Sequence, residues 1–208
     1  MAVSSTVTTE TQVANMALQR IGIGIISDIE TPGTDKAAIA VALIFADTRD
    51  EVCRMFPWAS VTGRTAIDGA AAEESMYALK QTLAATILRV LGLVDITAAT
   101  EQAEYRIEGT TIFFTLASGY IRHISQTATV ATWDPLLLEA IVLRLAMKLA
   151  VDLAGDLQLT VALQQEFISV ISIAMVTKAI EQNEQNEQVL SILNQQLQVL
   201  LLTKPGVI

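Results

Sequence analysis

The side chains that could carry out chemistry are few and stand far apart in this chain. His123 is the only histidine and Cys53 the only cysteine. Nucleophilic catalysis and zinc binding both need such groups in combination, as a nucleophile with its base or as three or four ligands. With no second histidine or cysteine nearby, we expect His123 to lie on a strand surface and Cys53 to pack as a small hydrophobic residue. We therefore predict no catalytic residue, no metal site and no cofactor.

Two further patterns suggest chemistry at first sight. Gly22-Ile23-Gly24 begins like a phosphate-binding loop, but the third glycine and the preceding strand of a dinucleotide fingerprint are missing. We interpret it as a loop after a helix. Mixed charges crowd residues 47–54 and could in principle act as general acids and bases. On a helix they are more typical of a solvated face or of salt bridges between subunits. The charged residues are Asp47, Arg49, Asp50, Glu51 and Arg54.

The composition is unusual for a protein surrounded by water. The chain of 208 residues is 52% hydrophobic and only 17% charged, with a mean hydropathy of +0.48, whereas soluble proteins average about 25% charged residues. We interpret this as a surface that is partly covered by partner subunits, because we find no uninterrupted apolar span of membrane length. The net charge of −9 argues against specific nucleic-acid binding, which depends on Lys and Arg.

The amino-terminal third predicts a short arm followed by two helices. Residues 1–8 read as a flexible arm, without the positive charge and apolar core of a secretory signal. Thr9 and Gln12 form a capping box that begins an amphipathic helix, ended near Gly22. A second long helix is predicted from Asp35 to Phe56, with Thr34 as its cap and Pro57 as its stop.

Two long helices are also predicted in residues 134–182, separated by a single glycine. The first spans residues 136–154, after Asp134 as N-cap and proline at the first helical position. Its four ionisable side chains argue against a transmembrane helix, so we expect a helix buried on most of its surface. These side chains are Glu139, Arg144, Lys148 and Asp152.

The second helix of this pair follows at residues 157–182. Gly155 can close the preceding helix in the left-handed conformation, and Asp156 can cap the new one. Apolar residues at spacings of three and four then predict one continuous packing stripe. The stripe consists of Leu159, Leu163, Phe167, Val170, Ile171, Ala174 and Met175.

The middle of the chain has a different period. Four short segments rich in β-branched and aromatic residues predict strands in hairpins, at residues 87–93, 105–108, 111–116 and 120–125. Residues 69–85 are ambiguous, and we expect a loop or a short helix there because alanine and glutamate favour helix.

These elements predict a mainly α fold with a small β insertion, an α+β arrangement. Residues 9–58 and 134–182 would form an antiparallel bundle of four helices, and residues 59–133 would form β hairpins between the second and third helix. Residues 183–208 would form an extended C-terminal arm. Its leucines repeat at three, four and three residues, which is typical of a helix that packs on another helix. They are Leu190, Leu193, Leu197 and Leu200.

Several short segments, in a consistent order between residues 11 and 167, match one known family. In their order and spacing the chain resembles the tail tubular protein A-like head-to-tail adaptor proteins of tailed bacteriophages. The matching segments are Asn15-Met16-Ala17-Leu18, Ile21-Gly22, Thr48-Arg49-Asp50-Glu51-Val52, Phe56-Pro57-Trp58-Ala59, Tyr77-Ala78-Leu79, Leu88-Arg89-Val90, Tyr105-Arg106-Ile107-Glu108-Gly109, Asp134-Pro135-Leu136 and Glu139-Ala140.

The resemblance implies a structural protein of the virion and no enzyme. Such adaptors form a homo-oligomeric ring, usually of twelve copies, in the neck between the portal protein and a tail or nozzle protein. DNA passes through the channel without specific binding, and the protein is made in the host cytoplasm. No membrane is implied. The alternative that the residues leave open is a small helical ligand-binding protein or an enzyme with no recognisable active site.

Two sets of residues become candidates for interfaces under this hypothesis. The apolar C-terminal arm would contact the portal, and charged or aromatic residues of the helices would form the subunit interface or the core. The portal candidates are Leu190, Leu193, Leu197, Leu200, Leu201 and Val207. The candidates for subunit interface or core are Arg49, Asp50, Phe56, Trp58, Arg144 and Lys148.

Overall fold

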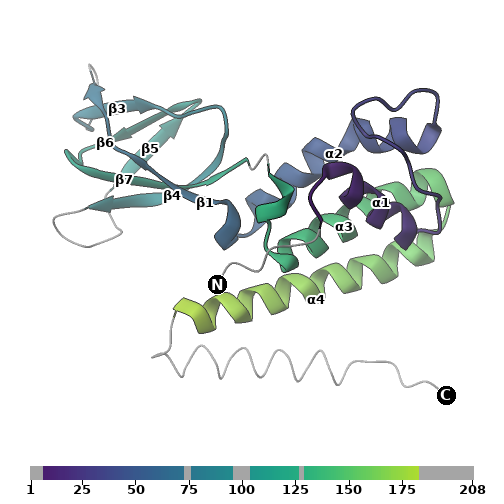
Figure 1. The fold of residues 1–208 in the computed structure, drawn as a ribbon. Coiled ribbons are helices and arrows are strands. Elements are labelled where there is room, and N and C mark those ends of the chain that lie inside the picture. Colours follow the sequence, from purple (N-terminus) through teal and green to yellow (C-terminus); the bar gives the residue numbers. More distant parts are fainter. Residues whose placement is uncertain (1–6, 73–75, 96–103, 127–128, 183–208) are drawn as a thin grey trace.

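The helices gather at one side of the molecule and the strands at the other (Figure 1). The computed structural model describes residues 7–72, 76–95, 104–126 and 129–182. The helical part consists of four α-helices and three short turns. The α-helices are α1 (Glu10–Arg20), α2 (Lys36–Met55), α3 (Pro135–Leu149) and α4 (Leu157–Gln182), and the short turns are η1 (Ala59–Val61), η2 (Val130–Thr132) and η3 (Ala150–Ala154).

Side-chain caps begin α1 and α2. The predicted capping box of α1 is confirmed, because the Thr9 hydroxyl accepts from the Gln12 amide at 3.2 Å and the Gln12 side chain accepts from the Thr9 amide at 3.2 Å. The predicted cap of α2 is wrong by one residue. Asp35, not Thr34, caps this helix, since its carboxylate accepts from the Ala37 amide at 2.9 Å.

The start of α3 is confirmed and its end is changed. Asp134 caps the helix by accepting from the Leu136 amide at 2.8 Å. The predicted α-helix to residue 154 gives way after Leu149 to the π-type turn η3, which closes at Gly155 with φ +64°. Asp156 then accepts from the Leu159 amide at 2.9 Å and begins α4, as predicted.

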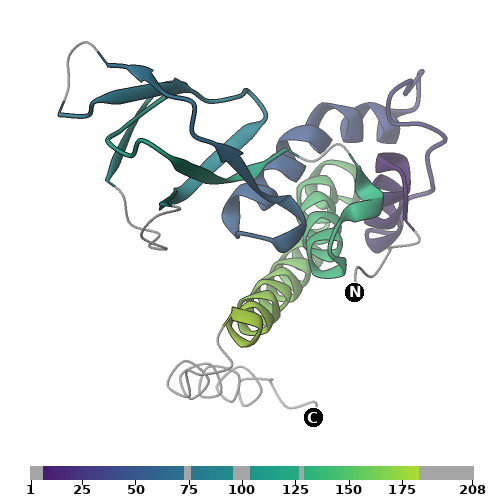
Figure 2. The ribbon, with the colours of Figure 1, turned by 60° about the vertical axis from the view of Figure 1, so that its left-hand side comes forward.

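The helical core is built around α3, which packs against α1, α2 and α4. In both views α2 and α4 lie on opposite sides of α3 (Figures 1 and 2). A helix surrounded in this way must be apolar nearly all round, which explains its composition. Its buried residues are Leu137, Leu138, Ala140, Ile141, Val142, Leu143, Leu145, Ala146, Met147 and Leu149.

The strands form two antiparallel sheets. One sheet has the order β1-β7-β4, from β1 (Thr62–Ala66), β7 (Gly119–Ser125) and β4 (Ile87–Asp95). The other has the order β2-β3-β6-β5, from β2 (Ala70–Ala71), β3 (Leu79–Thr82), β6 (Thr111–Phe114) and β5 (Tyr105–Glu108). The four predicted strands are therefore confirmed, with ends that differ by at most two residues.

The β part has a core of its own and shares two strands, β7 and β4, with the helical core. Val90, Leu93, Ile112, Phe114 and Ile121 are buried together between the strands. On β7, Ile121 belongs to this second core, whereas Ile124 belongs to the helical core. β7 thus contributes buried side chains to both cores, and the partly buried Leu88 and Leu91 of β4 also pack against the helical core.

The expected fold, a mainly α bundle with a small β insertion, is wrong. Seven strands in two antiparallel sheets with a separate core make this an α+β fold in which the β part is a principal component. We predicted no strand at Thr62–Ala66, and we expected a loop or short helix where β2 and β3 lie. The pairing of Leu79 with Phe114 places β3 in the sheet, because contacts between strands outweigh local helix propensity.

Candidate interaction surfaces

A group of ion pairs joins α2 to α3. The Glu51 carboxylate accepts from Arg144 Nε at 3.0 Å and Nη2 at 2.5 Å, and from Lys148 Nζ at 2.7 Å. Lys148 also donates to the Thr48 hydroxyl at 3.1 Å. Partial burial raises the pKa of Glu51, but the hydrogen bonds and charges of Lys148 and Arg144 outweigh this and hold the pKa below its ordinary value.

A second group ties α2 to α1 and to the end of β7. Arg49 Nη1 donates to Glu10 at 2.7 Å and its Nε donates to Asp50 at 2.8 Å. The other oxygen of Asp50 accepts from the Gln126 side chain at 2.6 Å. Burial alone would lower the pKa of Arg49, but the two carboxylates outweigh it and raise that pKa. This group fixes α1 and the β part against the same helix.

Two aromatic rings cover the end of α2. Phe56 and Trp58 pack edge to face with ring centroids 4.9 Å apart, and both are buried. Trp58 Nε1 donates to the Val52 carbonyl at 3.0 Å, which satisfies its buried N–H group. The pair closes the helical core beside the first strand.

All six residues predicted for the subunit interface or the core have partners within the chain. Phe56 and Trp58 pack together, and the four charged residues form ion pairs or hydrogen bonds. The charged residues are Arg49, Asp50, Arg144 and Lys148. These contacts fit a role in the core, and a role between subunits stays a prediction. The six portal candidates, Leu190, Leu193, Leu197, Leu200, Leu201 and Val207, lie outside the described residues.

His123 is buried, so the expectation of a strand-surface position is wrong. Its side chain lies in the middle strand of the β1-β7-β4 sheet, is only 7% exposed, and its Nε2 lies 2.9 Å from the Thr65 hydroxyl. Burial lowers the pKa of His123. Cys53 is buried as expected, and burial raises the pKa of its thiol to about 12. Within the described ranges, His, Cys, Asp and Glu form no group that could hold a metal ion.

The outer face of α4 is apolar and exposed. Between residues 157 and 177 the helix has only one charged residue, Glu166. Met175, which we placed in the packing stripe, is 49% exposed and belongs to this outer face instead. The sequence pattern did not separate the two faces because apolar residues occur on both. The exposed large apolar residues of α4 are Leu157, Val161, Ile168, Ile173, Met175 and Ile180.

The length and composition of α4 also meet the requirement for crossing a membrane, over Leu157–Glu181. The expectation that the chain has no span of membrane length is therefore wrong for this helix. The inner face of α4 is nevertheless attached to the other helices. Arg20 Nη1 donates to Glu166 at 2.9 Å, and the Arg144 guanidinium lies 5.9 Å from the centre of the Phe167 ring.

A smaller apolar surface lies on α2. Leu43 is 75% exposed, and Ile39 is exposed one turn before it. The two helices that carry exposed apolar side chains, α2 and α4, lie on opposite sides of α3 (Figures 1 and 2). Neither surface was identified from the sequence. The four-residue spacing of Ile39 and Leu43 is also typical of the buried side of a helix, so the sequence pattern alone does not show that they are exposed.

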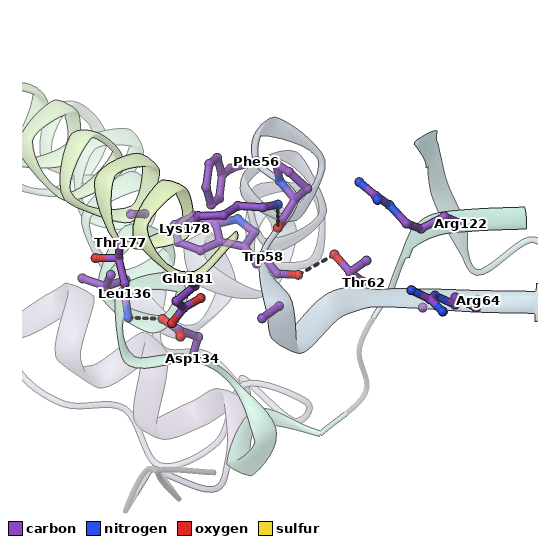
Figure 3. Close-up of a pocket in the computed structure, with 14 residues that line it drawn as sticks. Phe56, Trp58, Thr62, Arg64, Arg122, Asp134, Leu136, Thr177, Lys178 and Glu181 are labelled. Carbon is purple, nitrogen blue, oxygen red and sulfur yellow. Dashed lines mark hydrogen bonds between the residues drawn. The ribbon is translucent and has the colours of Figure 1, made fainter. Parts of the chain in front are cut away.

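A cleft of about 470 Å³ lies where the helices meet the β part (Figure 3). Arg64 and Arg122 reach it from β1 and β7, and Lys178 reaches it from α4. Asp134 and Glu181 line it from the helical side. The sequence could not indicate this cleft, because its lining comes from four separate stretches of the chain, within residues 56–64, 122, 134–136 and 174–181. Comparison with known proteins adds no assignment, as no family model and no curated protein matches the chain.

Proposed function

We propose that this protein is a head-to-tail adaptor of a tailed bacteriophage, a structural ring protein between the portal and the tail. The observation that carries the proposal is the presence of exposed large apolar side chains on two separate helices, α4 and α2. The matching segments between residues 11 and 167 support the same family. The protein acts in the neck of the virion and needs no cofactor.

Two different surfaces suit a ring better than a two-fold dimer. A dimer of the two-fold kind uses one patch on both subunits, whereas a ring uses two unlike patches that meet head to tail. In the proposed ring, the α4 face of one copy contacts the α2 face of the next. The six large apolar side chains of α4 are 48–70% exposed, so full cover of each would contribute roughly half of the ~1.5–3 kcal/mol that burial of a wholly exposed side chain gives.

The exposed apolar side chains of α4 are better explained by contact with another protein subunit than by contact with lipid. A spanning helix exposes its whole circumference to lipid or to other spanning helices. Here Leu163, Phe167, Val170 and Ala174 are buried against the helical core, and Glu166 forms an ion pair with Arg20. In the proposed function α4 therefore does not span a membrane.

The negative net charge of the chain is consistent with a channel through which DNA passes. A net charge of −9 weakens binding to the phosphate backbone, so that DNA can slide through the channel without being held. Twelve copies are proposed by analogy with the family, and the partners are the portal on one side and a tail or nozzle protein on the other.

Substitutions on α4 test the ring. We expect purified protein, alone or with the portal protein of the same virus, to form rings or portal-bound collars in negative-stain images and mass photometry. The double variant Val161→Lys, Ile168→Lys should weaken this assembly at least about tenfold, because two charges replace apolar contacts. Both residues are about half exposed, so the fold should be unaffected.

A matched variant controls for added charge. Thr110→Lys with Thr115→Lys adds the same two charges at exposed positions of the β part and should leave assembly unchanged. Wild-type protein that stays monomeric even with portal, or α4 variants that assemble like the wild type, would contradict the ring.

The C-terminal arm is proposed to contact the portal. The support is the leucine spacing of residues 190–200, since an apolar terminus of this kind needs a covering surface. Removal of residues 183–208 should abolish co-sedimentation with the portal while circular dichroism and thermal unfolding show an intact fold. Full portal binding by the truncated protein would rule out this role of the arm.

A further inference from the structure

The cleft at the junction has an apolar floor and charged walls. Phe56, Trp58, Leu136 and Ala174 contribute apolar surface to it. In the close-up, Arg64 and Arg122 project from the strands at one side, whereas Asp134 and Glu181 come from the helical side (Figure 3). The strand side of the cleft is thus positive, whereas the helical side carries both signs, with Lys178 beside Glu181.

Three cations converge on this cleft in a chain that is acidic overall. Arg64 and Arg122 stand directly opposite each other on the antiparallel strands β1 and β7, an arrangement of like charges that destabilises a sheet. Arg64 is exposed and forms no ion pair within the described part of the chain. An anion bound at Arg64 would therefore meet an exposed guanidinium group that has no ion-pair partner among the described residues.

Lys178 adds a third positive charge from α4. Its Nζ donates to the Pro57 carbonyl at 2.6 Å and lies 5.1 Å from the centre of the Phe56 ring. Burial and the nearby charge of Arg122 both lower the pKa of Lys178. The carboxylate of Glu181 acts in the opposite direction and raises this pKa, so Lys178 lies near charges of both signs.

We propose that this cleft binds a short acidic peptide segment of a partner protein. A carboxylate of the segment would be held by Arg64 and Arg122, since guanidinium groups match carboxylate geometry. A neighbouring apolar side chain would cover the aromatic floor, and peptide N–H groups could donate to Glu181. The inference does not depend on ring formation.

The residues that line the cleft are better suited to binding a peptide than to binding a nucleic acid. A phosphate backbone would meet the carboxylates of Asp134 and Glu181 and the net charge of −9, both of which repel it. A peptide segment has donors as well as acceptors, so that both walls of the cleft can be satisfied. The aromatic floor gives the apolar contact that anchors a short segment.

Selection from a random peptide display library on the full chain tests the proposal. Enriched peptides should combine Asp or Glu with a neighbouring apolar residue. Arg64→Gln should weaken their binding about tenfold, by the loss of a charge-assisted hydrogen bond. Arg106→Gln is the matched control, because Arg106 is exposed on β5 outside the cleft, and it should change nothing. Replacement of the acidic residues of a selected peptide by Gln and Asn should abolish binding.

Three outcomes would overturn the inference. One is that no peptide is enriched on the wild type relative to Arg64→Gln protein. Another is that the selected peptides lack acidic residues. The third is that duplex DNA displaces a selected peptide at physiological salt, which would assign the cleft to nucleic acid. A failure of ring assembly in the α4 experiment would leave all three readouts unaffected.

Discussion

Replacement of Gly119 by alanine is expected to lower the free energy of unfolding by about 3 kcal/mol, the upper end for overpacking a close-packed site. A Cβ atom at this position would lie 2.2 Å from the Val94 carbonyl oxygen and 2.9 Å from Leu116 Cδ2. The carbonyl belongs to the neighbouring strand β4, so the strands must separate to admit the methyl group. Gly119 pairs with Asp95 at the end of that ladder.

Urea unfolding followed by circular dichroism measures this loss. Gly24→Ala is the control, because a Cβ added at Gly24 meets no atom within 4 Å, and it should change stability by less than about 0.5 kcal/mol. Equal stabilities for the two variants would mean that β4 and β7 do not approach as closely as described here.

Replacement of Glu51 by glutamine is expected to cost about 2 kcal/mol at neutral pH. Glutamine keeps the shape of the side chain but leaves Arg144 and Lys148 facing each other without an anion. Loss of one partner of a buried ion pair costs ~3–5 kcal/mol and loss of a surface pair ~0–1 kcal/mol. Glu51 is one-third exposed (33%), so we place the cost between these limits.

The same variant should change how stability depends on pH. Because the pKa of Glu51 is lowered in the folded state, its contribution is fully present above the ordinary carboxyl pKa of about 4.3. That contribution is lost as the pH falls through the lowered pKa. Wild type and Glu51→Gln should therefore differ most at neutral pH and converge in acid.

A surface ion pair provides the comparison for Glu51. Glu108 pairs with Arg106 at 2.8 Å, and both side chains are more than half exposed. Glu108→Gln should cost less than about 0.5 kcal/mol at every pH. A constant difference between wild type and Glu51→Gln across the acid range would contradict the role assigned to this carboxylate.

The helices could be predicted from the sequence because their signals are local. Thr9 with Gln12, Asp134 with Pro135, and Gly155 with Asp156 each lie within a few residues of the end that they define. The cap of α2 was misplaced because Thr34 and Asp35 are both good capping residues. Only the geometry shows which side chain reaches the Ala37 amide.

The β part was underestimated because its stability comes from distant residues. Nothing near Thr62 indicates that β1 pairs with residues 120–124. Burial of His123 also results from the position of β7 between two strands, which no local pattern reports. The cleft could not be predicted either, because its lining residues are distant in the sequence. The outer face of α4 could not be predicted because the apolar residues of a helix do not show which of them are covered.

The shared strand β7 has a mechanical consequence. Because Ile124 is anchored in one core and Ile121 in the other, the sheet cannot swing on a flexible tether, and Gln126 holds its end to α2 through Asp50. A pull on the tip of the β part along β7 would load the hydrogen bonds to β1 and β4 in shear, all together, since these bonds run perpendicular to the strands. The β part is therefore rigidly attached to the helical layer, so that a force applied to it is transmitted to the helices.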